Sequence, residues 1–208
     1  MGNSNGTAGV GIFLAEKLVK NVINVERVND RLLMIKLLLS EAIVTVVSAY
    51  APQQGLSDIE KDSFYDTLIE KLAKCSDKEI VFLSGDLNGH VGNLSDGYDH
   101  VHGGFGFGSR NQEGDRILEF SLAMDMLVCN TYFKKRDSHL ITYSSGGYST
   151  HIDYNLTKKR YRKLVHDIKV IPGEEVFTQH KLLICNLSIS STSIKKKPPH
   201  SKAQSLEA

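Results

Sequence analysis

Side chains suited to phosphate and metal chemistry stand at the ends of short apolar runs along this chain. In chain order they are Tyr50, Asp86, Asn88, Asp153 and His180. Carboxylates, amides, phenols and imidazoles are groups with which enzymes bind metal ions and move protons. Enzymes built from sheets and helices place such residues where strands end. We therefore expect these five side chains to surround one cleft.

The elements that position these residues are mostly strands in the first half of the chain. Residues 10–14, 19–28 and 31–39 are rich in Val, Ile and Leu, and Asn29-Asp30 predicts a tight turn between antiparallel strands. Residues 42–49 form a nearly continuous β-branched run, which predicts a central strand buried on both faces. A short strand at 80–84 is predicted to stop at Gly85 and Asp86.

Two stretches have helical spacing. Apolar residues recur every three or four positions over 58–74, and Ser57 with Glu60 forms a capping box, so we predict a helix there. A second helix is predicted at 115–126, and a long glycine-rich loop over 87–113 separates the two. Further strands are predicted at 126–132, 140–143, 151–155, 168–171 and 182–189.

This order of elements indicates one α/β (α+β) domain over residues 9–189, in which mixed sheets pack together and are flanked by helices. Residues 1–8 are expected to be a flexible N-terminus. Residues 190–208 are rich in Ser, Lys and Pro, and we expect a disordered basic tail. Three consecutive lysines at 195–197 fit either a nuclear signal or, more simply, a solvated tail.

Composition limits the functional classes. With 208 residues, 24% of them charged, and a formal net charge of +1, the chain is not a strongly basic domain built to grip nucleic acid. The three cysteines, Cys75, Cys129 and Cys185, stand singly, which argues against a disulfide framework and favours a nuclear or cytoplasmic location. No apolar run reaches the length that spans a bilayer, so we expect no membrane partner, and no obligate protein partner is evident.

Four segments carry a resemblance to a known family: residues 48–52 (SAYAP), 84–89 (SGDLNG), 152–154 (IDY) and 178–180 (TQH). Together with the runs 111–120 and 170–187, they resemble the endonuclease/exonuclease/phosphatase superfamily. Within it, the chain is most similar to the apurinic-like endonuclease domain of non-LTR retrotransposons and to the craniofacial development protein 2-like proteins. The resemblance implies a four-layer sandwich, with two mixed β-sheets packed face to face and flanked by helices.

The resemblance also implies a reaction, the Mg²⁺- or Mn²⁺-dependent hydrolysis of phosphodiester bonds in DNA. Asp86 would orient or deprotonate the attacking water, while Asn88 and Tyr50 would donate hydrogen bonds to the phosphate. His180 would hold the phosphate as a cation, with Asp153 fixing its ring and raising its pKa. Asp86 and Asp153 would be the metal ligands.

The chain departs from the family pattern in two places. Members normally have a strand carrying an Asn, a helix and a strand ending in the metal-binding Glu before the segments found here, and no residue of this chain matches that Glu. The resemblance therefore implies a domain without its first strands and helix, which binds the metal weakly and cuts DNA weakly or not at all. Gln179 also stands where many members have Asp.

Three other interpretations stay open. One makes the chain a non-catalytic remnant that serves as a binding or scaffolding module. Another makes it a phosphatase of the same fold that acts on lipid or inositol phosphates, although the runs 111–120 and 170–187 favour the retrotransposon domains. In the third, His90, His100 and His102 are zinc ligands, but no Cys or carboxylate spacing supports such a site.

Overall fold

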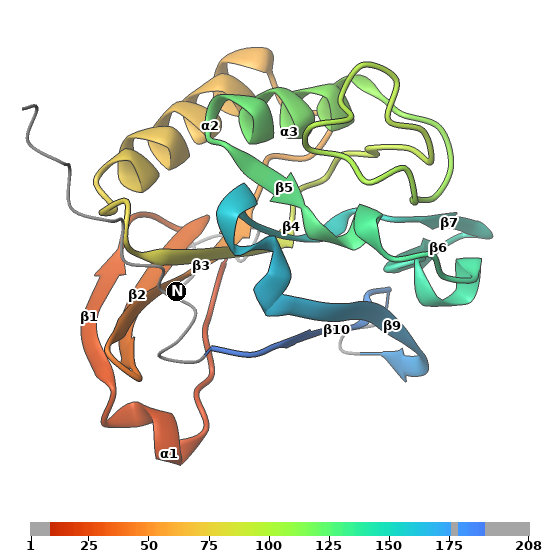
Figure 1. The fold of residues 1–208 in the computed structure, drawn as a ribbon. Coiled ribbons are helices and arrows are strands. Elements are labelled where there is room, and N and C mark those ends of the chain that lie inside the picture. The colour runs from red at the N-terminus through yellow and green to blue at the C-terminus, as the bar shows by residue number, and fades with distance from the viewer. Residues whose placement is uncertain (1–8, 176–178, 190–208) are drawn as a thin grey trace, which may run out of the picture.

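A computed structural model describes residues 9–175 and 179–189 and contains one large mixed sheet (Figure 1). Its strand order is β1-β2-β3-β4-β8-β5. The strands are β1 (Val22–Arg27), β2 (Leu32–Leu39), β3 (Ala42–Tyr50), β4 (Ile80–Asp86), β8 (Asp153–Lys158) and β5 (Met126–Val128). β3 and β4 run parallel, and every other neighbouring pair is antiparallel. The mixed sheet therefore has β3, β4 and β8 at its centre.

Two tight turns connect the first three strands. Between β1 and β2 the Asn29 side chain accepts a hydrogen bond from the backbone N–H of Arg31 (2.9 Å), as the turn prediction implies. Between β2 and β3, Ser40 and Glu41 both have positive φ (47° and 69°), which gives a two-residue hairpin the twist of its strands. The predicted strand at 10–14 is wrong, because these residues form no strand and a single helical turn, α1 (Glu16–Val19), follows them.

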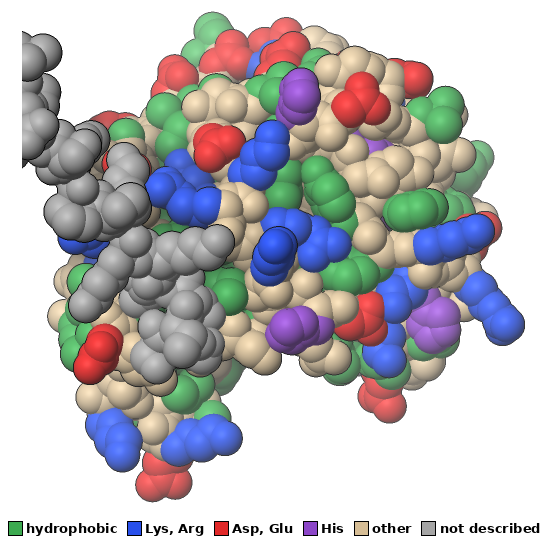
Figure 2. Space-filling view, in the orientation of Figure 1, with side chains coloured by type: hydrophobic (Ala, Val, Ile, Leu, Met, Phe, Trp, Pro, Cys, Tyr) green, Lys and Arg blue, Asp and Glu red, His purple; other side chains and the backbone are tan. Residues whose placement is uncertain are grey.

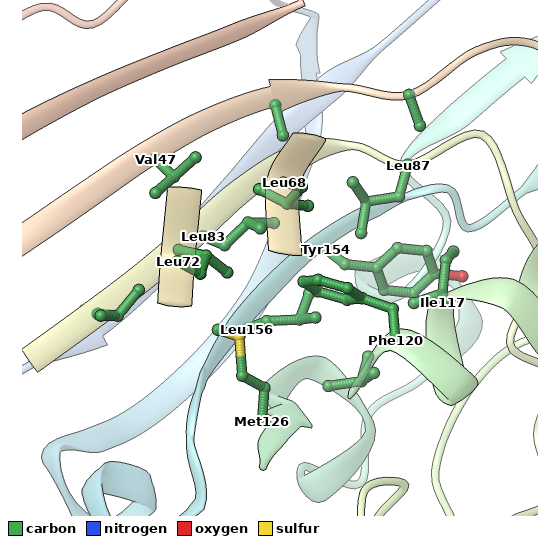
Figure 3. Close-up of a cluster of buried hydrophobic side chains, with 14 of the residues drawn as sticks. Val47, Leu68, Leu72, Leu83, Leu87, Ile117, Phe120, Met126, Tyr154 and Leu156 are labelled. Carbon is green, nitrogen blue, oxygen red and sulfur yellow. The ribbon is translucent and has the colours of Figure 1, made fainter. Parts of the chain in front are cut away.

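Both long helices, α2 (Asp58–Ala73) and α3 (Gln112–Ala123), lie on one side of the large sheet (Figure 1). The capping box is present, since the Ser57 side chain accepts from Glu60 N–H and the Glu60 carboxylate accepts from Ser57 N–H. Figure 3 shows the apolar side chains that fill the space beneath the helices. They include Leu68 of α2, Leu156 of β8 and Leu83 of β4, all at most 1% exposed. Burying each such side chain contributes about 1.5–3 kcal/mol.

A second sheet packs against the other side of the large sheet. It consists of the antiparallel strands β9 (Val165–Glu175) and β10 (Lys181–Leu187). A second apolar cluster joins the layers, with Val44 and Phe82 of the large sheet facing Ile168 of β9. A small hairpin, β6 (Tyr143–Ser145) and β7 (Tyr148–Thr150), and three 3-10 turns complete the fold. The turns are η1 (Cys129–Tyr132), η2 (Asp137–His139) and η3 (Lys159–Leu164).

The predicted fold class, sheets packed together with flanking helices, is confirmed. Most predicted elements occur with shifted ends, since β4 extends to Asp86, α3 begins at Gln112, and the predicted strand at 126–132 is divided into β5 and η1. The expected flexible N-terminus, the basic tail and the first residue of the segment 178–180 lie outside the described residues. Among the residues described, no helix is long and apolar enough to cross a membrane.

Candidate active site

The register of three adjacent strands brings three predicted site residues into one row. Tyr50 of β3 pairs with Asp86 of β4, and Asp86 pairs with Asp153 of β8. Residues paired across neighbouring strands point to the same face of a sheet, so these side chains lie side by side. Between β3 and β4 the approach is close: a Cβ on Gly85 would stand 1.8 Å from the carbonyl oxygen of Ala49. A glycine is therefore required directly before Asp86.

A tight turn after β4 fixes the Asp86 carboxylate. The backbone N–H of Asn88 donates to Asp86 Oδ1 (2.9 Å), and Asn88 has a positive φ of 49°, which Asn tolerates better than most residues. The Asn88 side chain donates one of its two N–H groups to the carbonyl oxygen of Ala51 (2.8 Å). Asn88 therefore ties β3 to β4 and keeps a second amide N–H for a ligand.

The first turn of α3 packs against this loop and is hydrogen-bonded to it. Asn111 caps the helix by accepting from the N–H of Gly114 (2.9 Å), and the same side-chain oxygen accepts from the N–H of His90 (2.8 Å). The helix and the loop approach so closely that a Cβ on Gly114 would stand 1.8 Å from the carbonyl oxygen of His90. The loop that carries Asn88 is thus held by the start of a buried helix.

Thr142 holds the backbone at Asp153, the residue that carries the second carboxylate. Its side chain is fully buried, and its Oγ1 accepts from the backbone N–H groups of Ile152 and Asp153, both at 3.1 Å. Its carbonyl oxygen accepts from the N–H of Lys181 (2.8 Å), the first residue of β10. Thr142 therefore connects the start of β8 to the start of β10, which is where the predicted histidine lies.

His180 faces both carboxylates. Its Nδ1 lies 3.1 Å from Asp153 Oδ2, and its Nε2 lies 3.9 Å from Asp86 Oδ2. The ring also meets the edge of Tyr143, with centroids 4.9 Å apart. The hydrogen bond to Asp153 raises the pKa of His180, and partial burial opposes this rise. The histidine is therefore stabilised as a cation, in the orientation that the sequence predicts.

Burial and repulsion act together on Asp86. Removal from water, followed by the nearby negative charge of Asp153, raises the pKa of the Asp86 carboxyl to about 7, although the Asn88 N–H and His180 lower it. A carboxyl with a pKa near neutrality can accept and release protons at physiological pH. This is the property expected of a group that deprotonates water.

Tyr50 lies at the mouth of the same cleft. Its hydroxyl accepts a hydrogen bond from Gln53 Nε2 (3.1 Å), which leaves the phenolic O–H available to donate. The guanidinium of Arg31 stands 5.1 Å from the ring centroid and donates to the Tyr50 carbonyl oxygen (3.3 Å). Tyr50 is thus positioned by contacts with its ring and backbone rather than through its hydroxyl alone.

The structure brings all five predicted residues together. Tyr50, Asp86, Asn88, Asp153 and His180 line one open cleft of about 1310 Å³.

Sequence reasoning missed further polar residues in this cleft. Ser84 donates to Asn155 Oδ1 (2.6 Å), and both line the cleft beside Asp86 and Asp153. The available signal was their spacing: each stands two residues from a predicted carboxylate on a strand, and therefore on the same face. Tyr143 also lines the cleft, but it lies far from His180 in the sequence, and only tertiary structure places it there.

The oxygen atoms in the cleft are of the type that a hard divalent cation prefers, but only two of the groups that carry them are charged. Asp86 and Asp153 supply carboxylate oxygens, and a cation between them would relieve the repulsion that contributes to the raised pKa of Asp86. Within residues 9–175 and 179–189, no group of three His, Cys, Asp or Glu side chains is arranged so that it could hold a metal ion. Two carboxylates alone bind Mg²⁺ weakly.

Two neighbouring features take other roles. Gln179 turns toward the β6–β7 hairpin, where it accepts from the Tyr143 hydroxyl (3.1 Å) and donates to Ser145 (2.8 Å). His102, considered above as a zinc ligand, is a buried histidine whose Nδ1 accepts from the N–H of Gly104 (3.1 Å) and whose Nε2 lies 3.2 Å from the carbonyl oxygen of Gly92. His102 therefore has hydrogen-bond partners on both ring nitrogens.

Comparison with known proteins found two curated relatives and several solved structures of similar fold. No family model matches it. Over 190 residues, 90% of this chain, it is 30% identical to craniofacial development protein 2 of Bos taurus. Over 190 residues it is 28% identical to craniofacial development protein 2 of Tragulus javanicus. The chain spans about a third of the length of these curated relatives (32% and 33%).

Solved structures similar to the chain include the endonuclease domain of TRAS1, a telomere-specific non-LTR retrotransposon. The TM-score is 0.57 at 14% identity, over 86% of this chain and 69% of that one. The 3′ phosphatase NExo from Neisseria, bound to a product DNA hairpin, gives 0.60 at 11% identity over 81% and 72%. The AP endonuclease LMAP from Leishmania major gives 0.54 at 13% identity over 77% and 56%.

Proposed function

We propose that the cleft of this chain hydrolyses phosphodiester bonds in DNA with the help of a divalent metal ion. The proposal starts from the fold, which is that of the endonuclease/exonuclease/phosphatase proteins. One observation carries the proposal: in the cleft, His180 lies 3.1 Å from the Asp153 carboxylate and 3.9 Å from the Asp86 carboxylate. A buried base, a second carboxylate and a cationic imidazole are the groups that such a reaction needs.

Each group has a role that follows from its surroundings. Asp86, which lies beside Asp153 and His180 in the cleft, orients or deprotonates the attacking water. His180, with its pKa raised by Asp153, holds the negative charge of the phosphate. Tyr50 and Asn88 donate hydrogen bonds to the remaining phosphoryl oxygens. Mg²⁺ or Mn²⁺, held by Asp86 and Asp153, would supply further charge neutralisation when bound.

We expect this activity to be low in the 208-residue chain, because the cleft offers two carboxylates to the metal. Loss of a metal ligand or its support commonly costs on the order of 10 to 100-fold in affinity or activity. The likeness to the TRAS1 domain also supports a retrotransposon origin.

A second candidate function is a non-catalytic DNA-binding or scaffolding module. The observation in its favour is that, in the part of the chain that is described, no group of three potential ligands is arranged to hold a metal ion.

Nicking of supercoiled plasmid DNA in millimolar Mg²⁺ or Mn²⁺ tests the proposal. We expect slow, EDTA-sensitive nicking that Asp86→Ala and His180→Ala abolish. The matched controls are Asp66→Ala and His100→Ala, which change exposed residues outside the cleft and should nick at the original rate.

The other outcomes separate the candidates. If Asp86→Ala nicks as fast as the original chain, the cleft is not the catalytic site. Rapid nicking that Asp86→Ala abolishes would show that two carboxylates suffice and that our expectation of low activity is wrong. DNA binding without any nicking would favour the non-catalytic module.

A further inference from the structure

Lysine and arginine side chains gather on the face of the molecule shown in Figure 2, beside β9 and over the turn η3 that precedes it. Two chain segments supply them. Residues 132–137 and 158–167 together contain eight lysines and arginines and two aspartates, a formal charge of +6 in a chain whose total is +1. The chain therefore contains a strongly basic region although its net charge is low. We define the basic patch as Lys134, Lys135, Arg136, Lys159, Arg162 and Lys163.

Stacking contacts join the two segments into one surface. The Arg162 guanidinium lies 5.0 Å from the ring centroid of Tyr132 and 4.9 Å from that of Phe133. Lys135 Nζ lies 6.0 Å from the Phe133 centroid and 2.5 Å from Asp167 Oδ1 at the start of β9. Residues about 30 positions apart in the sequence are thus held in place by packing on two aromatic rings.

Much of the positive charge is available to a ligand. Lys134, Arg136, Lys159 and Lys163 are exposed, and their side chains form no ion pair or hydrogen bond with other described residues. Of the two aspartates in these segments, Asp167 is engaged by Lys135 and Asp137 is exposed. Four cations beside one free carboxylate repel one another, and binding of an anionic ligand would relieve this repulsion.

We propose that the basic patch binds the phosphate backbone of a nucleic acid, at a site separate from the cleft. Cations clustered around aromatic rings are typical of surfaces that follow a nucleic-acid strand without reading its bases. A membrane surface is the less suitable partner, because within 132–137 and 158–167, all of them described, no large apolar side chain is exposed.

The patch lies away from the proposed catalytic residues. Asp153 begins β8 and Lys158 ends it, so the strand, about 17 Å long at about 3.3 Å per residue, separates η3 from Asp153. No residue of the patch is among those that line the cleft in the described chain. The inference goes beyond the proposed hydrolysis and does not depend on it.

Fluorescence anisotropy with a labelled single-stranded oligonucleotide, in EDTA so that no cleavage occurs, tests the inference. The patch variant is the triple substitution Arg136→Gln, Lys159→Gln, Lys163→Gln. Its matched control is Lys17→Gln, Lys20→Gln, Arg27→Gln, which removes the same charge from exposed positions on α1 and β1.

We expect the patch variant to bind about tenfold or more weakly at low salt, and the control variant to bind as the original chain does. The slope of log affinity against log salt should fall by about 2 in the patch variant, since each lost contact with a single strand contributes about 0.7. If both triple variants lost the same affinity for the oligonucleotide, the loss would reflect total charge alone, and the proposal of a specific binding site would be wrong. Unchanged oligonucleotide binding with lost binding to phosphatidylserine vesicles would overturn the choice of partner.

Discussion

The large sheet and the β9–β10 sheet support the proposed site to different degrees. Strands β3, β4 and β8 are covered by helices on one face and by the second sheet on the other, and residues such as Val47 and Leu83 are fully buried. Strand β10 is only partly buried along its length, with Leu182 and Leu187 each 38% exposed. The two carboxylates stand on the first sheet, and His180 precedes β10. A well-buried sheet therefore positions the two carboxylates, while the position of the imidazole depends on a more exposed strand.

The largest change in stability is expected when one leucine from each sheet is replaced by alanine and the two losses are compared. Leu156→Ala in β8 should lower the free energy of unfolding by about 3–5 kcal/mol, because the fully buried side chain leaves a cavity. Leu187→Ala in β10 should cost less than about 1 kcal/mol, since its side chain is already part exposed. Urea denaturation measures both, and equal losses would remove the difference between the sheets.

Variants of a buried ion pair test how α2 and α3 are held together on the large sheet. Lys61 of α2 and Glu113 of α3 meet at 2.9 Å with side chains 7% and 8% exposed, and Lys61 also donates to the carbonyl oxygen of Gln54 (2.9 Å). Lys61→Met should cost about 3–5 kcal/mol, because it leaves the Glu113 charge buried without a partner. The double variant Lys61→Met, Glu113→Leu should regain much of this loss in thermal unfolding. If it does not, the charge of Glu113 is not the cause.

Thr142 tests the connection between the two sheets. Thr142→Val keeps the shape of the side chain but removes the oxygen that accepts from Ile152 and Asp153, which should cost about 1–3 kcal/mol. Under the proposed function, DNA nicking should also fall, since Asp153 would lose its support. Thr67→Val is the control, because its hydroxyl donates only to the carbonyl oxygen of Ser63 on the partly exposed side of α2. A similar loss of nicking in both variants would argue against this connection.

The smallest expected effect is a pH dependence from the loop after β4. Burial lowers the pKa of His102, and its Nδ1 accepts from Gly104 N–H, so the folded chain favours the neutral ring. The stability from His102 is therefore fully present above its ordinary value of about 6.5 and is lost as pH falls through the lowered folded-state value. Unfolding measured between pH 7 and 5 should depend less on pH in His102→Gln than in the control His100→Gln. Equal slopes would refute this role.

Local signals predict the helix-covered half of the fold well. The capping box of Ser57 and Glu60 fixes the start of α2, and the β-branched run identifies β3 as a central strand. The β6–β7 hairpin was predicted only in part, because its strands are short, polar and exposed and show no apolar alternation. Gly146 and Gly147, both with positive φ, were the remaining signal for its turn.

The resemblance identified the five candidate residues and the pairing of Asp153 with His180, but not the contacts that produce this pairing. The contact between His180 and Asp153 depends on a bridge between Tyr143 and His180 and on Thr142, none of which a local pattern indicates. The basic patch was missed because its two segments are separated in the sequence and the acidic residues elsewhere balance the total charge.

Gly114, at the start of α3, has a consequence for engineering this protein. Replacing a helical glycine by alanine is a common route to thermostability, worth up to about 1 kcal/mol when the site has room. Here the added methyl group would collide with the carbonyl oxygen of His90, so helix and loop would have to separate. A design method that scores helix propensity alone would choose Gly114→Ala, and that choice would release the loop carrying Asn88 from its support.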